Sequence, residues 1–380
     1  MKKLLLFSLL SCFTFTIQAQ NWTWAESAGG ILPDEANGCT MDNNGNMYMS
    51  GFYFSSSINF GNGVSLLNSG VSEGYIVKYN GNGSAQWASR MKGSLEDKAT
   101  KCAVDQSGNV FVTGYYDSKF LQFGEDVANK ISNFDTRGGT FDGFIVKYNA
   151  SGTPLWHHSI GKVDDDGGAS VATDSEGNVY VTGWFRAPII TAGAFSIYNK
   201  DATGGSSDMF LIKYDPNGNV LWAKNAGSKE DDKGRGCIVD VNDNVIVTGY
   251  LKGESIDIDG AIIASNGSKD AFLIKYNSNG VLLASKVFGG NGSEEAFGCS
   301  VDANSNIYLT GNYTSSILQF DNINLNNTGG GSGVFLAKLN PMLNTVWAKG
   351  ASSSSNDEPR GCSTDSYGNT LITGVFNGPS

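Results

Sequence analysis

The stretch GCTMDNNGNMYMSGFY, residues 38–53, has five close copies further along the chain. The copies are KCAVDQSGNVFVTGYY (101–116), SVATDSEGNVYVTGWF (170–185), GCIVDVNDNVIVTGYL (236–251), GCSVDANSNIYLTGNY (298–313) and GCSTDSYGNTLITGVF (361–376). Their shared Asp lies at positions 42, 105, 174, 240, 302 and 365, so the pattern returns every 62 to 69 residues. A period of this size indicates a solenoid, a propeller or another repeat array.

A second pattern alternates with the first, for example FIVKYNASGTPLW at residues 144–156. Its Lys lies at positions 78, 147, 213, 275 and 338. Nine residues separate each shared Asp from the Gly of the TG or SG pair that follows, and 27 separate each Lys from the next Asp. Only the connection between that Gly and the Lys varies, from 26 to 33 residues. All insertions therefore fall in one connection of the repeat.

Each repeat predicts four short strands. Runs such as CAV and NVFVTG are rich in residues that favour strands, and an Asp/Asn/Gly turn joins them. FIVKY predicts a third strand, and the segment with Trp87, Trp156, Trp222 or Trp347 predicts a fourth. Four antiparallel strands per repeat, without helical periodicity, predict an all-β fold, a β-propeller of about six or seven four-stranded blades in residues 20–380.

The two ends of the chain carry separate expectations. NWTWAES, residues 21–27, matches AQWASR, residues 85–90, with Trp24 at the position of Trp87. We expect this segment to be a fourth strand that completes the last blade and closes the ring. The sixth repeat reaches Ser380 before a third strand, so we expect an incomplete last blade here and a native protein that continues further.

The two patterns, G-[CIV]-x-x-D-x-x-G-N-[VI]-Y-[VL]-T-G and D-x-F-[LI]-[IV]-K-Y-[ND]-x-x-G-x-x-x-W, resemble the bacterial β-propeller repeats known as SBBP repeats. The resemblance runs from about Asn21 to the end of the chain and departs at Val171, Ala284 and Leu339. It implies a repeat protein of the exported kind and carries no specific function.

Composition narrows the class of protein. Glycine accounts for 50 of 380 residues, against a usual share of about 7 %, and suits many tight turns. The net charge of −11 argues against a nucleic-acid partner, which needs a basic surface. The five cysteines after residue 20 occupy equivalent repeat positions, too far apart for disulfides, so we expect small buried apolar residues.

Residues 1–19 read as a secretory signal peptide, with Lys2 and Lys3 before an apolar run and Ala19 at its end. Lipidation at Cys12 is the alternative. No later stretch is long and apolar enough for a spanning helix. The leader and the Asn- and Gly-rich style resemble secreted or outer-surface proteins of Bacteroidota, which often carry a C-terminal sorting domain. We therefore expect a secreted or surface-exposed monomer.

Antiparallel order brings the start of the first strand, the end of the second and the start of the third to one face of the ring. The variable connection lies there too, and such loops tend to carry binding. An acid precedes every first strand on this face: Asp34, Asp97, Asp166, Asp232, Glu294 and Asp357. Further candidates for ligand contact are Tyr115, Trp184, Arg186 and Tyr250, and a second set of acids opens the third strand: Glu73, Asp142, Asp208 and Asp270.

These residues can also have purely structural roles. A repeated acid at a strand entry commonly accepts backbone N–H groups in a turn, and the aromatic residues can serve as blade packing. Calcium is the alternative ligand of the acids, with Asp164, Asp165 and Asp166 as its nearest approach to a site. No other cofactor is indicated.

No catalytic constellation stands out. The only histidines, His157 and His158, are adjacent and should point to opposite faces of a strand. The sequence therefore predicts an exported, non-catalytic binding module for a protein or glycan on the loop-bearing face. The alternative is a propeller-based polysaccharide hydrolase or lyase that uses the carboxylates of that face.

Overall fold

A computed structural model describes residues 24–135 and 139–377. All of the named secondary-structure elements in this part of the chain are β-strands. The prediction of an all-β chain is confirmed. The expected signal peptide (1–19) and Cys12 lie outside the described residues. No helix of the described part could cross a membrane.

The larger strands form five four-stranded antiparallel units, the blades, and one final two-stranded sheet, and two of the blades belong to six-stranded sheets that also include a small hairpin. Blade 1 contains β1 (Asp34–Met41), β2 (Met47–Tyr53), β5 (Glu73–Tyr79) and β6 (Ala85–Lys92). Blade 2 contains β7 (Asp97–Val104), β8 (Val110–Tyr116), β11 (Asp142–Tyr148) and β12 (Pro154–Ile160). Blade 3 contains β13 (Asp166–Thr173), β14 (Val179–Phe185), β17 (Asp208–Tyr214) and β18 (Val220–Gly227).

Blade 4 contains β19 (Lys233–Val239), β20 (Val245–Lys252), β23 (Lys269–Tyr276) and β24 (Leu282–Phe288). Blade 5 contains β25 (Glu294–Val301), β26 (Ile307–Tyr313), β29 (Gly333–Leu339) and β30 (Thr345–Ala351). The final hairpin pairs β31 (Glu358–Thr364) with β32 (Thr370–Val375). In each complete blade the sheet order follows the chain from the inner to the outer strand, as predicted.

The variable connection contains a small hairpin in each complete blade, which the sequence did not predict. These hairpins are β3–β4 (Ser57–Asn59, Ser65–Leu67), β9–β10 (Phe120–Phe123, Lys130–Ser132), β15–β16 (Ile189–Ala192, Phe195–Tyr198), β21–β22 (Ser255–Ile258, Ala261–Ala264) and β27–β28 (Ile317–Phe320, Ile323–Asn326). β9 pairs with outer strand β6 of the preceding blade, and β21 pairs with β18. The insertion thus helps to join neighbouring blades.

The shared Asp of the first pattern holds the turn between the first two strands. Asp42 accepts hydrogen bonds from the backbone N–H groups of Asn44 and Asn46, from the Asn46 amide and from the Tyr48 hydroxyl. Its five counterparts accept from the same positions of their turns. The predicted Asp/Asn/Gly turn between the first two strands is confirmed.

The Lys and Trp of the second pattern join each blade to the next. Lys213 Nζ and Trp222 Nε1 both donate to the carbonyl oxygen of Ser278, in the next blade, at 3.0 Å. The same pair of bonds recurs at Ala150 and at Pro216. The Lys also forms an ion pair with the shared Asp of its own blade in Lys213–Asp174, Lys275–Asp240 and Lys338–Asp302. We call this repeated contact the seam.

One seam departs from the pattern and compensates for the departure. The Trp222 ring packs on Gly280 of the next turn, whose φ of +76° suits glycine. In the next seam Ala284 replaces the Trp, and Leu343, with a φ of +65°, replaces the Gly. Leu343 is buried in the same hydrophobic cluster as Ala284, so its side chain occupies the space that a Trp would fill.

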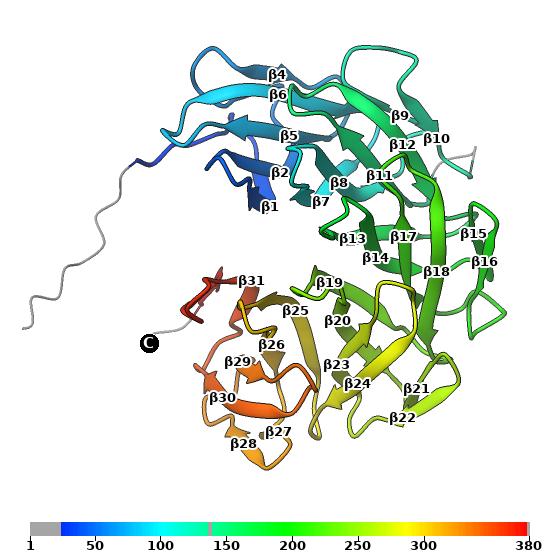
Figure 1. Cartoon of the computed structure of the whole chain (residues 1–380), viewed down its shortest axis with the longest axis vertical. Helices are drawn as coiled ribbons and strands as arrows, with labels where there is room; N and C mark the ends of the chain where they lie inside the picture. Colours follow the sequence, from blue (N-terminus) through cyan, green and yellow to red (C-terminus); the bar gives the residue numbers. More distant parts are fainter. Residues whose placement is uncertain (1–23, 136–138, 378–380) are drawn as a thin grey trace, which may run out of the picture.

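The blades follow one another along an open arc (Figure 1). Each inner strand contacts the next, from β1 through β7, β13, β19 and β25 to β31, and no β1–β31 pairing forms among the described residues. Residues 24–28 have no regular secondary structure, and residues 21–23 lie outside the described part, so the expected N-terminal strand is not confirmed. Trp24 nevertheless donates to the Gly81 carbonyl at 3.2 Å, the bond that the seam tryptophans make.

The burial of each cysteine depends on its position along the arc. Cys102 and Cys237 are buried between blades, where burial raises their pKa to about 12. Cys299 and Cys362 are half-buried, and all five described cysteines are free thiols. Cys39 is exposed, contrary to expectation, because it lies on the face of blade 1 that no preceding blade covers.

Candidate functional site

A β-bulge occurs at the same place in every inner strand. In β19, for example, Gly234 pairs with Gly249 and Gly236 pairs with Thr248, so Arg235 between them is extra. The bulged residues lie three positions after the first acid of each repeat. They are Asn37, Thr100, Ala169, Arg235, Phe297 and Arg360. Bulges redirect side chains, and here they aim one residue per blade toward the centre of the arc.

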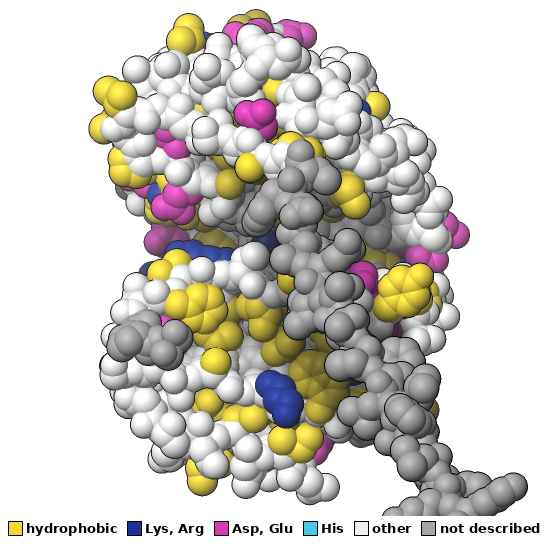
Figure 2. Space-filling view, turned by 90° about the vertical axis from the view of Figure 1, so that its left-hand side faces the viewer, with side chains coloured by type: hydrophobic (Ala, Val, Ile, Leu, Met, Phe, Trp, Pro, Cys, Tyr) yellow, Lys and Arg dark blue, Asp and Glu magenta, His cyan; other side chains and the backbone are white. Residues whose placement is uncertain are grey.

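These residues line a central cavity of about 660 Å³, which we call the funnel. Its remaining lining residues are Glu35, Ala36, Phe52, Lys98, Lys101, Tyr115, Trp184 and Glu358. The bulged residues and these remaining residues together come from all five blades and from the final hairpin. Figure 2 shows the hollow from the open side of the arc, with Lys and Arg side chains between the two ends. The funnel is the place where residues that differ between repeats meet.

Aromatic rings hold several cations at the funnel. Lys98 Nζ lies 4.8 Å from the centre of the Phe52 ring, and Lys233 Nζ lies 4.6 Å from that of Trp184. The Arg235 guanidinium lies between the Tyr250 and Phe297 rings, at 5.5 and 6.0 Å. Cation–π contacts of this kind are worth about 0.5–2 kcal/mol and fix the direction of a long side chain.

Carboxylates neutralise part of this positive charge. Arg235 Nε lies 2.7 Å from Glu295 Oε1, and Lys269 binds the other oxygen of the same carboxylate. Lys98 pairs with Glu96 at 3.0 Å. Burial and the neighbouring Arg235 lower the pKa of Lys233, so the two cations repel each other. The lining of the funnel itself contains four basic and two acidic residues.

The predicted contact residues divide into two groups. Tyr115 and Trp184 lie in the funnel, with ring centres 5.9 Å apart in an edge-to-face arrangement. Tyr250 is buried beneath Arg235 and Lys269. Arg186 does not line the funnel; its guanidinium donates to the Gly204 and Gly205 carbonyls of its own connection. Sequence reasoning missed the bulged residues, although comparing the repeats column by column reveals their variability.

The first set of acids lies inside the blade junctions. Each accepts the backbone N–H of a residue 20 or 21 positions further on, at Phe54, Ser118, Arg186, Lys252, Ser315 and Asn377. Five of the six acids are buried, and Asp34 is half-buried. Burial raises the pKa of Asp166 to about 7 and that of Asp232 to about 8. These hydrogen bonds anchor the start of the variable connection to the first strand.

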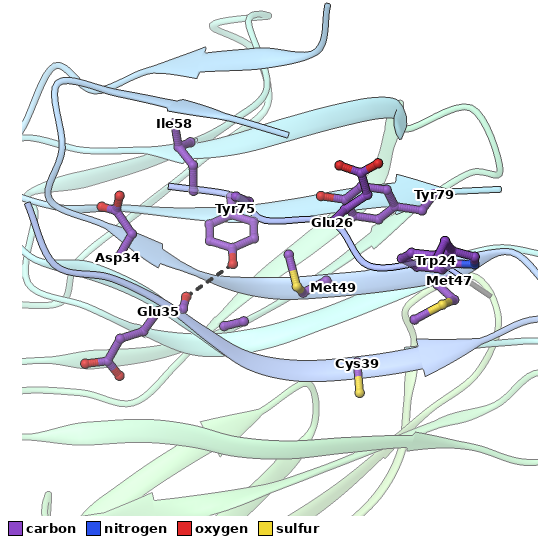
Figure 3. A pocket seen from close by; sticks show the side chains of 12 residues that line it. Trp24, Glu26, Asp34, Glu35, Cys39, Met47, Met49, Ile58, Tyr75 and Tyr79 are labelled. Carbon is purple, nitrogen blue, oxygen red and sulfur yellow. Dashed lines mark hydrogen bonds between the residues drawn. The ribbon is translucent and has the colours of Figure 1, made fainter. Parts of the chain in front are cut away.

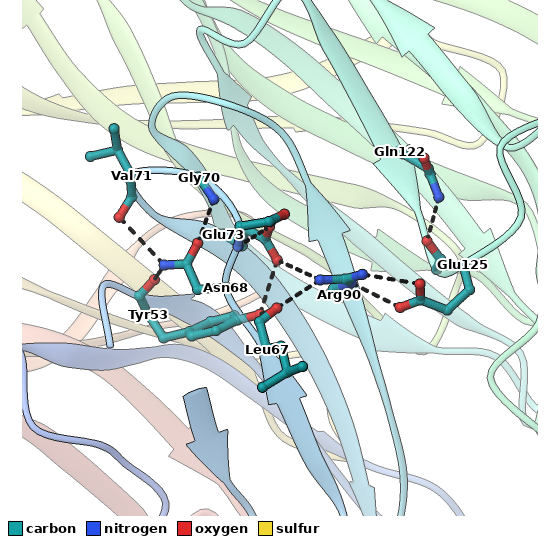
Figure 4. Close-up of polar contacts among 11 residues, drawn as sticks. Tyr53, Leu67, Asn68, Gly70, Val71, Glu73, Arg90, Gln122 and Glu125 are labelled. Carbon is teal, nitrogen blue, oxygen red and sulfur yellow. Dashed lines mark hydrogen bonds and ion pairs between the residues drawn. The ribbon is translucent and has the colours of Figure 1, made fainter. Parts of the chain in front are cut away.

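The second set of acids is buried beside the first, with Asp142 facing Asp166 across Gly161. Its member in blade 1, Glu73, belongs to the polar cluster of Figure 4. Glu73 accepts the Tyr53 hydroxyl at 3.0 Å and lies 3.7 Å from Arg90, which also binds Glu125 through two hydrogen bonds. These contacts join three strands and the β9–β10 connection.

The geometry around Asp164, Asp165 and Asp166 bears on the calcium alternative. Both oxygens of Asp166 accept backbone N–H groups, from Lys162 and from Arg186, and Asp165 accepts the N–H of Phe141. Within residues 24–135 and 139–377, no three His, Cys, Asp or Glu side chains form a metal-binding group. The histidines pack instead: His157 stacks on Phe123, and His158 stacks on Tyr214.

A second cavity, of about 420 Å³, lies on the uncovered face of blade 1 (Figure 3). Trp24, Cys39, Met47 and Met49 line it, together with Tyr75, whose hydroxyl donates to the Glu35 carbonyl. Equivalent faces of blades 2 to 5 are covered by the preceding blade. This cavity is thus the exposed half of a seam at the end of the arc.

Comparison with known proteins bears on the repeat itself. The profile of the SBBP beta-propeller repeat matches residues 156–184, from outer strand β12 through β14 of the next blade. The chain carries an SBBP repeat. The resemblance inferred from the two sequence patterns is confirmed, and the matched segment contains Trp156 of one seam and the bulged inner strand β13.

Three relatives illustrate how far the similarity reaches. An uncharacterized WD repeat-containing protein of Acanthamoeba polyphaga mimivirus is 24% identical over 94% of this chain and 31% of its own length. Regulatory protein FlaEY of Caulobacter vibrioides is 27% identical over 37% of this chain and 15% of its own length. A solved structure, a DUF4221 family member from Bacteroides vulgatus, is 10% identical and covers 93% of this chain and 96% of that one, with a TM-score of 0.38. The chain spans about a third or less of the length of the two curated relatives.

Proposed function

We propose that this chain is an exported, non-catalytic binding module that engages a protein ligand in the funnel. The observation that carries the proposal is the bulge in every inner strand. It gathers the non-repeating residues Asn37, Arg235, Phe297 and Arg360 around one cavity, while the repeated residues form the seams. A repeat scaffold needs identical contacts for stability and a single asymmetric surface for recognition.

A protein ligand is favoured over a glycan by two observations. The mimivirus relative is named as a WD repeat-containing protein, a propeller class associated with protein partners. In addition, Lys98 and Lys233 already occupy a face of the Phe52 and Trp184 rings, on which a neutral sugar would stack. A glycan remains the second class of ligand to be screened.

The enzymatic alternative, a polysaccharide hydrolase or lyase, has less support. The acids of the first set are bound to backbone N–H groups inside the junctions, which leaves Glu35 and Glu358 as the carboxylates of the funnel. Turnover of an acidic polysaccharide that is lost in Glu35→Gln or Glu358→Gln would establish the alternative.

We also propose that the complete propeller has six or seven blades and that the segment at Trp24 supplies an outer strand for the last one. Trp24 makes the seam bond to Gly81 without a blade of its own, which supports this placement. Export rests on the sequence of residues 1–19. The intact mass of the protein released by its own cells tests it; an N-terminus near Gln20 is expected, and retention of Met1 would contradict export.

The binding function is tested by affinity capture with the full chain and with a variant of the funnel. Trp184→Ala together with Tyr115→Ala is expected to lose the captured protein while remaining folded by circular dichroism. Lys349→Ala, on the exposed outer strand β30, is the control and should retain the protein. Equal capture by all three proteins would contradict the proposal.

A further inference from the structure

We infer that the funnel recognises an acidic segment of its partner polypeptide, a run of Asp and Glu side chains. This inference rests on the proposed function and specifies the chemistry of the ligand. The sequence carries a net charge of −11, yet the lining of the funnel contains four basic and two acidic residues. The basic residues are Lys98, Lys101, Arg235 and Arg360. Positive charge is thus concentrated at one place in an acidic protein.

The cations are held in place before a ligand arrives. The Phe52 ring fixes Lys98, and the Tyr250 and Phe297 rings fix Arg235. Their directions are therefore set without loss of side-chain entropy on binding, which favours affinity. Arg235 also presents a planar guanidinium, and only its Nε is engaged by Glu295. Its remaining N–H groups suit a carboxylate.

Three of the four lining cations have a carboxylate partner, and the counter-charge is incomplete; Lys98 pairs with Glu96 at 3.0 Å. Arg235 and Lys269 share the single carboxylate of Glu295. Arg360 lies 3.6 Å from Glu358, and both of these side chains are exposed. The ion pairs among the described residues do not include Lys101, whose amino group extends toward Gly361 on the opposite strand β31. A ligand carboxylate would supply the counter-charge that Lys101 lacks.

The groups of the funnel lie around the centre of the arc. The funnel is bounded by Glu35 on β1 and by Glu358 on β31, and these two strands do not pair. Figure 2 shows the hollow between the two ends of the arc. In the six- or seven-bladed propeller proposed above, a polypeptide segment would reach these groups along the axis of the ring.

Isothermal titration with the full chain tests the inference. The probes are oligo-glutamate, oligo-glutamine and oligo-lysine peptides of equal length, and polygalacturonate as an acidic glycan. We expect oligo-glutamate to bind and the other two peptides not to bind. Affinity should fall by at least about tenfold from low to high salt, because exposed charges are screened. Stronger binding of polygalacturonate, or equal binding of the three peptides, would overturn the inference.

Charge reversal locates the site. Lys101→Glu is expected to weaken oligo-glutamate binding by about tenfold or more. Lys349→Glu makes the same change in net charge on β30, away from the funnel, and should leave the affinity unchanged. An equal loss of affinity in both variants would show that net charge alone causes the effect, and it would overturn the inference. If oligo-glutamine alone binds, the inference fails while the proposed binding function stands; if the affinity capture also fails, both fail.

Discussion

The seams are built from side chains that the repeats share, whereas the funnel is lined by side chains that differ between repeats. At the seams, Lys213 and Trp222 meet the Ser278 carbonyl, and the corresponding residues make the same contact in the preceding junctions. At the funnel, the six bulged positions hold five different residue types, although the backbone shifts register at the same place each time. The difference teaches that the backbone repeats throughout, whereas the side chains repeat where they hold turns or join blades and vary where they line the funnel.

The largest effect is expected from breaking a seam ion pair. Lys275→Met leaves Asp240 buried without its partner, which lies 2.9 Å away. The free energy of unfolding should fall by about 3–5 kcal/mol, as measured by urea denaturation. Lys349→Met, on the exposed outer strand β30, is the control and should change it by less than about 0.5 kcal/mol. Equal stability of Lys275→Met and the unmodified chain would contradict the role of the pair.

Removal of a seam tryptophan should cost somewhat less. Trp222→Ala loses the packing on Gly280 and the hydrogen bond to Ser278. Because Trp222 is half-buried, we expect a loss of about 3 kcal/mol, at the lower end for aromatic deletions. Trp222→Phe keeps part of the packing and should lose less. If the two variants are equally stable, the ring does not join the blades as described.

The exceptional seam allows a test of compensation. Ala284→Trp should clash with Leu343, and Leu343→Gly should leave a cavity, each at a cost of about 2 kcal/mol. The double variant restores the Trp–Gly pair of the other seams and should lose less than the sum of the single variants. A double-mutant cycle by thermal denaturation measures this coupling. Strict additivity would show that the two positions do not share one space.

The buried acids predict how stability depends on pH. Burial raises the pKa of Asp142 to about 8 and that of Asp208 to about 7, well above the value of about 4 in an unfolded chain. The folded state therefore holds these protons longer. Their contribution is fully present below about pH 4 and is lost as the pH rises through 7 to 8.

We therefore expect the free energy of unfolding to fall between about pH 5 and pH 8, by at most about 1.4 kcal/mol per pH unit and group. Below about pH 4 a second loss should begin. Burial opposes a low pKa at Asp302, but hydrogen bonds from Asn306 lower it to about 2. Urea midpoints at several pH values measure the profile. Asp142→Asn should flatten the slope above pH 5, and a stability that rises from pH 5 to 8 would contradict the assignment.

The smallest effect on stability is expected in the funnel. Lys101→Glu changes a partly exposed residue outside every seam, so the free energy of unfolding should change by less than about 0.5 kcal/mol. Thermal denaturation measures it beside Lys275→Met. A loss as large as that of the seam variant would show that the funnel also supports the fold, and the contrast between the two regions would fail.

Local sequence patterns were sufficient for the blade itself. Turn chemistry predicts the Asp–Asn turn at Asp42, and strand alternation predicts the strand at Val110–Tyr116. The antiparallel order predicts that Asp34, Tyr53 and Glu73 share one face. These features depend on hydrogen bonds between residues close in the sequence, or on the fixed order of antiparallel neighbours. The sequence patterns also marked Ala284 as a departure, but not Leu343, which takes the Gly position beside it.

The candidate site was predicted only in part. Tyr115 and Trp184 reach the funnel as expected, whereas the acids of the same face turn inward and bind backbone N–H groups. Alternation alone cannot separate the two outcomes, since both kinds of residue stand at strand ends. The bulge that aims Arg235 toward the centre is a register shift between β19 and β20, which strand propensity does not encode.

The sequence by itself determined the repeat, the four-stranded blade and the turns, because these depend on spacing and on the pairing of strands that follow one another along the chain. The tertiary structure alone decided which residues meet across blades: Lys275 with the Pro341 carbonyl, Ala284 with Leu343, and Arg235 with Lys101 around one cavity. The reason is physical. Contacts between blades depend on the twist and packing of whole sheets, which no single segment specifies.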